Sequence, residues 1–326
     1  MSTRAQPTVS LVLGSGGARG YAHIGAIEEL LAQGYAIRSV AGASMGALIG
    51  GVYAAGKLDA YRDWVRELQK LDVLRLLDWT FRGGGLIKGD RIVDKLRELI
   101  GEINIEELSV PYTAVAVDLI AQREVWFSRG SLFDAIRASI AIPTVFRPHR
   151  YEGRVLVDGG LLNPVPITPT LRDLTDCTIA VDLNAPAETP ESVSADTPID
   201  PAQVESMSEG VPVVAETTPA ETDEQPSALG YKQKLTELLG GLLEKREKKP
   251  DEVADTGLLE TFARSLDVVQ ATVTRFKLAA QPPDLLVSIP RNAAAFYEFH
   301  RAEELIELGR MRTRAALRDF KPGHRP

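Results

Sequence analysis

Cysteine and histidine are scarce in this chain of 326 residues, and their scarcity excludes several kinds of site. The single cysteine, Cys177, allows no internal disulfide and no four-thiolate zinc site, which fits a reducing compartment. The four histidines lie far apart in the sequence, and none stands at the spacing of a zinc-binding pair. We therefore expect no metal site.

Long apolar runs and a net positive charge are missing as well. The longest uncharged stretch, 39–56, consists mostly of Gly, Ala and Ser, which favours a packed strand, turn and helix over a membrane-spanning helix. Val9–Leu13 is too short for the core of a signal peptide. The formal charge of −8 and the pI of 5.2 argue against nucleic acid as a partner. We expect a cytoplasmic protein that can also associate peripherally with a membrane.

Strand-like and helix-like segments alternate along most of the chain. This alternation predicts an α/β fold with three layers, in which a mainly parallel sheet lies between helices. The expected strands are 8–13, 37–41, 113–118, 124–127, 154–157, 178–183 and 284–289. The expected helices are 22–31, 45–55, 58–71, 90–100, 131–140, 258–276 and 293–320.

The composition changes sharply after the sixth expected strand. Residues 185–229 contain seven prolines and ten acidic residues but no lysine, arginine or aromatic residue. Such a segment cannot bury enough apolar surface to fold, so we expect a disordered acidic insertion. An amphipathic helix and a short linker are expected over 230–254, and one discontinuous domain over 8–184 and 255–320. Without the insertion the net charge is +2, so the folded body can approach an anionic membrane surface.

A G-x-S-x-G element, Gly42-Ala43-Ser44-Met45-Gly46, stands between an expected strand and an expected helix. This context is typical of a serine nucleophile on a sharp turn, with Gly42 and Gly46 forming the elbow. The alternative is a glycine-rich turn in which Ser44 only caps the helix.

A second glycine-rich turn, Gly14–Gly20, also follows a strand and opens a helix. Its backbone N–H groups can bind an anion, either a cofactor pyrophosphate or the oxyanion of an acyl-transfer intermediate. Dinucleotide binding is disfavoured because Arg19 occupies the sixth position of the fingerprint, and no acidic residue lies between Glu29 and Asp59. The alternative is that the glycines serve only close helix–strand packing.

Asp158-Gly159-Gly160 follows a further expected strand. A desolvated carboxylate at Asp158 within hydrogen-bond reach of Ser44 can act as its base, whereas the alternative is an ordinary turn. Together the three elements indicate an acyl hydrolase with a Ser–Asp pair. A triad of the α/β-hydrolase type would need His300 or His324, the two histidines that follow Asp158.

These elements resemble those of the patatin-like phospholipases, with the bacterial single-domain branch as the nearest match. The resemblance runs from about Val9 to Leu183 and over the last strand and helix. It includes further segments: Arg137-Ala138-Ser139, Ile142-Pro143, Phe146 and Asn163-Pro164-Val165-Pro166. Two features depart from the family pattern: Ser15 stands where many members carry glycine, and the acidic insertion is unusual.

The resemblance implies a serine hydrolase that cleaves carboxylic esters of lipids or lysophospholipids without a cofactor. It implies a Ser44–Asp158 dyad, a turn at Gly159 and Gly160, and an oxyanion loop formed around Gly16 and Gly17 with Ala18 and Arg19. Arg19 can bind a lipid phosphate or tie the loop to the domain. A catalytically silent protein that binds lipid or a partner is the alternative from another class.

Overall fold

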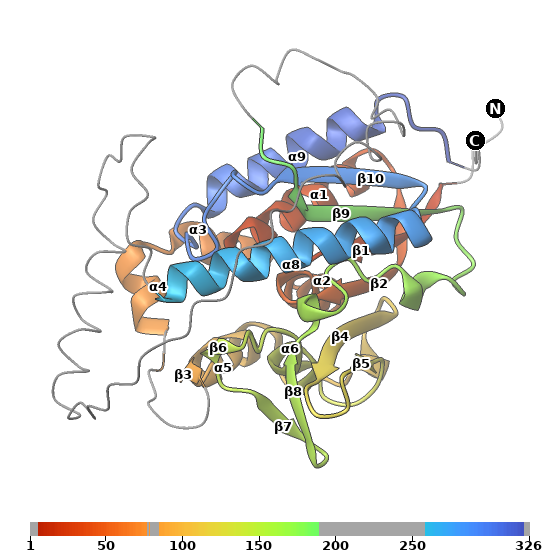
Figure 1. The fold of residues 1–326 in the computed structure, drawn as a ribbon. Coiled ribbons are helices and arrows are strands. Elements are labelled where there is room, and N and C mark those ends of the chain that lie inside the picture. The colour runs from red at the N-terminus through yellow and green to blue at the C-terminus, as the bar shows by residue number, and fades with distance from the viewer. Residues whose placement is uncertain (1–5, 77, 79–84, 189–257, 323–326) are drawn as a thin grey trace, which may run out of the picture. The chain divides into compact units, whose positions relative to one another are not determined.

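The computed structural model describes residues 6–76, 78, 85–188 and 258–322, whose fold Figure 1 shows. Their main sheet has the strand order β10-β9-β1-β2-β4-β8-β7, and β5 pairs with β4. The neighbours from β10 to β4 are parallel, whereas the β4–β8, β7–β8 and β4–β5 pairs are antiparallel. The strands are β1 (Thr8–Leu13), β2 (Ala36–Ala43), β4 (Tyr112–Asp118), β5 (Arg123–Phe127), β7 (His149–Tyr151), β8 (Arg154–Asp158), β9 (Cys177–Ala185) and β10 (Leu285–Pro290).

Helices cover both faces of this sheet, because its central strands bury side chains in both directions. Leu11 and Leu13 of β1 join the large core beneath α1, α2 and α9, whereas Val12 packs on the opposite face in a cluster that includes Leu278 of α8. The helices are α1 (Ala22–Ala32), α2 (Met45–Ala54), α3 (Leu58–Glu67), α4 (Lys70–Leu76), α5 (Asp90–Ile100), α6 (Leu132–Ser139), α8 (Leu258–Ala280) and α9 (Ala302–Leu317). The three-layer fold with a mainly parallel sheet is confirmed.

Several boundaries differ from the sequence-based expectation. The helix expected over 58–71 is interrupted because Leu68 takes an extended conformation. The last helix begins at Ala302 rather than near 293, because Ala294 and Phe296 use their carbonyls to hold the loop after β1. A small parallel pair, β3 (Gly85–Ile87) with β6 (Thr144–Phe146), was not expected, and neither was β7.

The first four residues of the expected acidic insertion, 185–188, belong to the folded body instead. Strand β9 continues to Ala185, and Glu188 still exchanges hydrogen bonds with Asn292. Residues 189–257, which contain the rest of the insertion and the expected amphipathic helix, lie outside the described residues. Within the described ranges, none of the helices has the length and apolar composition needed to cross a bilayer.

Candidate active site

Ser44 lies at a sharp turn between the parallel strand β2 and helix α2. Its backbone has φ 55° and ψ −124°, a combination that costs energy for a residue with a side chain. The turn is held by Ser139 of α6, whose hydroxyl accepts from the Ser44 N–H at 2.9 Å and donates to the Val115 carbonyl at 2.6 Å. The strand, turn and helix of the expected elbow are all present.

The elbow glycines are required by close backbone contacts. A Cβ on Gly46 would lie 2.0 Å from the carbonyl oxygen of Leu13, and one on Gly42 would lie 2.3 Å from that of Gly46. Because backbone cannot move aside as a flexible side chain does, both positions exclude larger residues. The glycines of the motif therefore let α2 start directly against the end of β1.

Asp158 lies at the end of β8, and its carboxylate faces Ser44 across 114 positions of sequence. Its Oδ2 accepts a hydrogen bond from Ser44 Oγ at 2.6 Å, and its Oδ1 accepts from the Gly160 N–H at 2.7 Å. The bond to Oδ2 has the short length typical of a hydroxyl donating to a carboxylate. Gly159 allows the turn, since a Cβ there would lie 2.0 Å from the Val115 carbonyl oxygen.

Burial makes this carboxylate unusually basic. Asp158 is only 2% exposed, and desolvation raises its pKa from 3.8 to about 7, against the hydrogen bonds from Ser44 and Gly160, which favour the charged form. A carboxylate with a pKa near neutrality can accept a proton from a bound hydroxyl far better than an ordinary aspartate. Burial and contact with a hydroxyl therefore coincide at one residue.

The glycine loop after β1 packs directly against the elbow, because a Cβ on Gly20 would lie 2.4 Å from that of Met45. Within the described part of the chain, the N–H groups of Gly16 and Gly17 have no hydrogen-bond partner. The N–H of Ala18 donates to the Phe296 carbonyl at 2.9 Å and is already used. The loop thus offers two adjacent backbone donors, an arrangement that suits an oxyanion.

Arg19 ties the loop to the domain. Its guanidinium is buried and bonds the Arg291 carbonyl (2.9 Å), the Ala294 carbonyl (3.2 Å), Asn184 Oδ1 (3.3 Å) and Asp267 Oδ1 (3.1 Å). Of the two roles considered for Arg19, these four contacts match the structural tie. These contacts occupy both terminal nitrogens, and the remaining Nε, which has no partner among the described residues, is buried.

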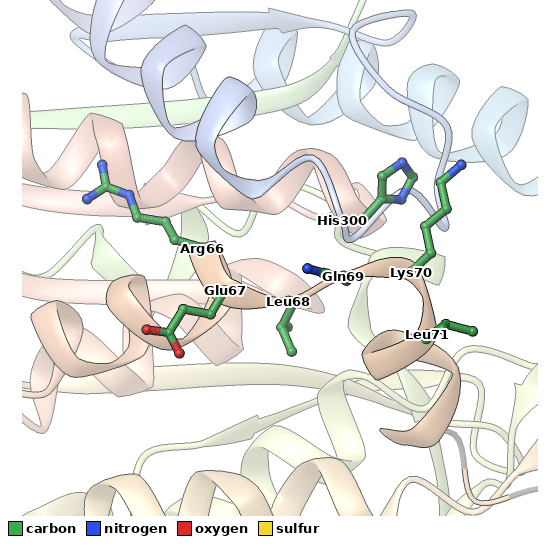
Figure 2. A pocket seen from close by; sticks show the side chains of 7 residues that line it. All are labelled: Arg66, Glu67, Leu68, Gln69, Lys70, Leu71 and His300. Carbon is green, nitrogen blue, oxygen red and sulfur yellow. The ribbon is translucent and has the colours of Figure 1, made fainter.

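The histidines do not join the Ser44–Asp158 pair. Among the described residues no histidine makes a hydrogen bond with either side chain, and His324 lies outside those residues. His300 lines a pocket at the α3–α4 junction, where it lies beside Lys70 (Figure 2). Burial and the Lys70 charge lower its pKa.

His23 has a packing role behind the glycine loop. It is fully buried, and its Nε2 contacts the Gly14 carbonyl at 2.8 Å. Burial lowers its pKa to about 4, so at neutral pH the ring is neutral and Nε2–H donates to that carbonyl. In the described part of the chain, no three His, Cys, Asp or Glu side chains cluster as a metal site.

Two residues around the site carried no sequence signal for their position. Ser139 entered only through the family resemblance, although its hydroxyl holds the elbow. Gln270 of α8 accepts a hydrogen bond from Ser15 Oγ at 3.0 Å, across 255 positions of sequence. No local motif marks either contact, because each depends on the tertiary fold.

Comparison with known proteins identifies the family. The family model described as "Patatin-like phospholipase" matches residues 11–171, inside the stretch that the motifs indicated. Uncharacterized NTE family proteins of Mycobacterium tuberculosis and Mycobacterium bovis are 40% identical over 338 residues, covering 97% of this chain and 93% of theirs. The neuropathy target esterase of Drosophila persimilis is 32% identical over 166 residues, which is 49% of this chain and 12% of that protein.

Among solved structures, that of VipD from Legionella pneumophila matches with a TM-score of 0.43 and 13% identity, covering 96% of this chain and 67% of that one. The mycobacterial relatives, in contrast, match over nearly the whole chain. The chain therefore belongs to the patatin-like phospholipase family, and relatives that match over nearly its whole length are NTE family proteins.

Proposed function

We propose that the protein is a serine hydrolase that cleaves carboxylic esters of lipids through Ser44 and Asp158. The observation that carries the proposal is the 2.6 Å hydrogen bond from Ser44 Oγ to Asp158 Oδ2, with the serine on a strained elbow. A serine that merely capped α2 would direct its hydroxyl to the first N–H groups of that helix, and Ser44 makes no such bond.

In the proposed reaction Ser44 Oγ attacks the acyl carbonyl while Asp158 accepts its proton. The N–H groups of Gly16 and Gly17 stabilise the oxyanion, and one such donor is typically worth about 10²–10³ in rate. The protonated Asp158 then gives its proton to the departing alcohol, which leaves an acyl-enzyme. Water, activated by the same carboxylate, attacks the acyl-enzyme and frees Ser44.

The family supports a proposal for the substrate class. A family model described as "Patatin-like phospholipase" and a relative named neuropathy target esterase both match this chain, so we propose phospholipid or lysophospholipid acyl esters as substrates. No metal or organic cofactor takes part in the steps above. The protein would meet its substrate at a lipid surface, which fits peripheral membrane association, and we propose the cytoplasm as its compartment.

The test is covalent labelling with a fluorophosphonate, followed by ester hydrolysis. We expect labelling of the wild type and none of Ser44→Ala, whereas Ser288→Ala, which removes an exposed hydroxyl on β10, should label normally. Hydrolysis should be measured on esters graded by acyl length and on phosphatidylcholine and lysophosphatidylcholine vesicles. Labelling that persists in Ser44→Ala refutes the assignment. A wild type that neither labels nor hydrolyses any ester would instead indicate the silent lipid-binding protein.

A further inference from the structure

Ser15, the residue that departs from the family pattern, is held from three directions. Its N–H donates to the Pro164 carbonyl at 2.8 Å, and its carbonyl accepts from Asn184 Nδ2 at 2.9 Å. Its hydroxyl donates to Gln270 Oε1 at 3.0 Å, and both of these side chains are buried. A glycine at position 15 could keep the first two bonds but not the third.

The position of Ser15 gives this third bond its significance. Gly16 and Gly17, whose N–H groups are unpaired in the described chain, stand between Ser15 on one side and Ala18 on the other. Ala18 is fixed by the Phe296 carbonyl, and Ser15 by the bonds just described. The direction of the two free N–H groups therefore depends on how firmly both flanking residues are held.

Gln270 also contacts the turn that carries the carboxylate. A Cβ on Gly160 would lie 2.7 Å from Ser15 Oγ and 2.8 Å from Gln270 Nε2, so the Ser15–Gln270 pair packs onto the Gly160 backbone. The N–H of Gly160 is the donor to Asp158 Oδ1. One buried amide thus touches the glycine loop and the aspartate turn together.

We propose that Gln270 is a positioning residue that acts through Ser15 to aim the Gly16 and Gly17 N–H groups at the oxyanion. The proposal rests on the function proposed above. Helix α8 begins more than two hundred residues after the glycine loop in the sequence. The proposal gives this helix an effect on the rate of the chemical step. Gln270 touches neither substrate nor reacting atoms.

The expected effect lies in kcat rather than KM. Loss of the Gln270 acceptor leaves a buried hydroxyl without a partner, so Ser15 turns and the adjacent N–H groups move. Because the oxyanion forms only in the transition state, a displaced donor slows the reaction without weakening substrate binding. We expect Gln270→Met, which keeps the side-chain volume but not the acceptor, to lower kcat about tenfold, part of the loss of a whole donor. KM should stay within about twofold.

The experiment compares Gln270→Met, Ser15→Ala and the double variant, using kcat and KM on a soluble ester and the rate constant of fluorophosphonate labelling. The two single variants should slow both reactions to a similar degree. The double variant should be no slower than either one, because the two side chains act as a unit. The matched control is Gln281→Met, which removes the Oε1 acceptor of the 2.7 Å bond from Thr168 Oγ1 just beyond α8. This control should keep the wild-type kcat even if its melting temperature falls.

Three results would overturn the proposal: wild-type kcat in Gln270→Met, a loss confined to KM, or additive losses in the double variant. If Gln270→Met does not fold, Ser15→Ala removes the same bond from the other side and decides alone. A wild type without labelling or hydrolysis would refute the proposed function instead, so the two failures can be told apart.

Discussion

Asp158 and Asp182 are two buried aspartates near the ends of different strands, and they differ in their partners. Each accepts a hydrogen bond from the N–H two residues later, that of Gly160 or Asn184. Burial raises both pKa values, to about 7 for Asp158 and about 6 for Asp182.

The difference lies in what faces each carboxylate. Asp158 receives the Ser44 hydroxyl, whereas Asp182 lies near the positive charge of Arg19, and no hydroxyl among the described residues donates to it. Burial alone therefore supplies basicity at both places. The neighbouring group decides what the carboxylate can do. Asp158 can accept a proton from the Ser44 hydroxyl, whereas Asp182 faces only the positive charge of Arg19.

The largest expected effect comes from removing each carboxylate in turn. Asp158→Asn keeps the size of the side chain but removes the base, and we expect kcat/KM to fall by about 10²–10⁴. Asp182→Asn should lower it by less than about tenfold, because Asp182 has no bond to Ser44. The measurement is steady-state hydrolysis of one soluble ester by both variants. Equal losses of kcat/KM in the two variants would show that the hydrogen bond to Ser44 gives Asp158 no special role.

The second effect is the pH dependence of the reaction. Asp158 accepts a proton only when ionised, so kcat/KM should rise about tenfold per pH unit below 7 and level off above it. The profile should be recorded between pH 5 and 9 on a soluble ester. In Asp182→Asn the midpoint should stay near 7. A midpoint near pH 4, or one that shifts in Asp182→Asn, would contradict the statement that burial raises the pKa of the catalytic base Asp158.

Local motifs of this sequence carry more information than its distant contacts do. The elbow, the glycine loop and the aspartate turn were all predictable, because close backbone approach at Gly46 and Gly159 demands glycine and so leaves a pattern in the sequence. The alternation of strand-like and helix-like segments along the chain likewise predicted the layered fold.

Contacts between distant segments left no such pattern. The bonds of Ser139 to the elbow and of Gln270 to Ser15 join residues 95 and 255 positions apart. The segment before α9 was expected to be helical, yet its carbonyls bond Ala18 and Arg19. In each case tertiary contact, rather than local propensity, sets the conformation.

The smallest expected effect concerns stability. Ionisation should destabilise the folded protein at both carboxylates, and more at Asp158 than at Asp182. Folding raises the pKa of both carboxyls and so favours their protonated forms. Their contribution to the free energy of unfolding is therefore full below about pH 4 and is lost as the pH rises through the folded pKa. The ionised form costs at most roughly 4 kcal/mol at Asp158 and roughly 3 kcal/mol at Asp182. Thermal melts of both Asn variants at pH 4 and pH 8 measure the difference.

At pH 8 we expect Asp158→Asn to raise the melting temperature by a few degrees and Asp182→Asn to raise it less, because the amide carries no charge to desolvate and Arg19 offsets part of the cost at Asp182. At pH 4 neither gain should appear, since the folded wild type then holds both carboxyls protonated. This result would show that the larger loss of stability from burying an ionised carboxylate occurs at Asp158, the residue that faces Ser44. If a variant raised the melting temperature as much at pH 4 as at pH 8, the stabilisation would come from packing and not from the loss of an ionised group.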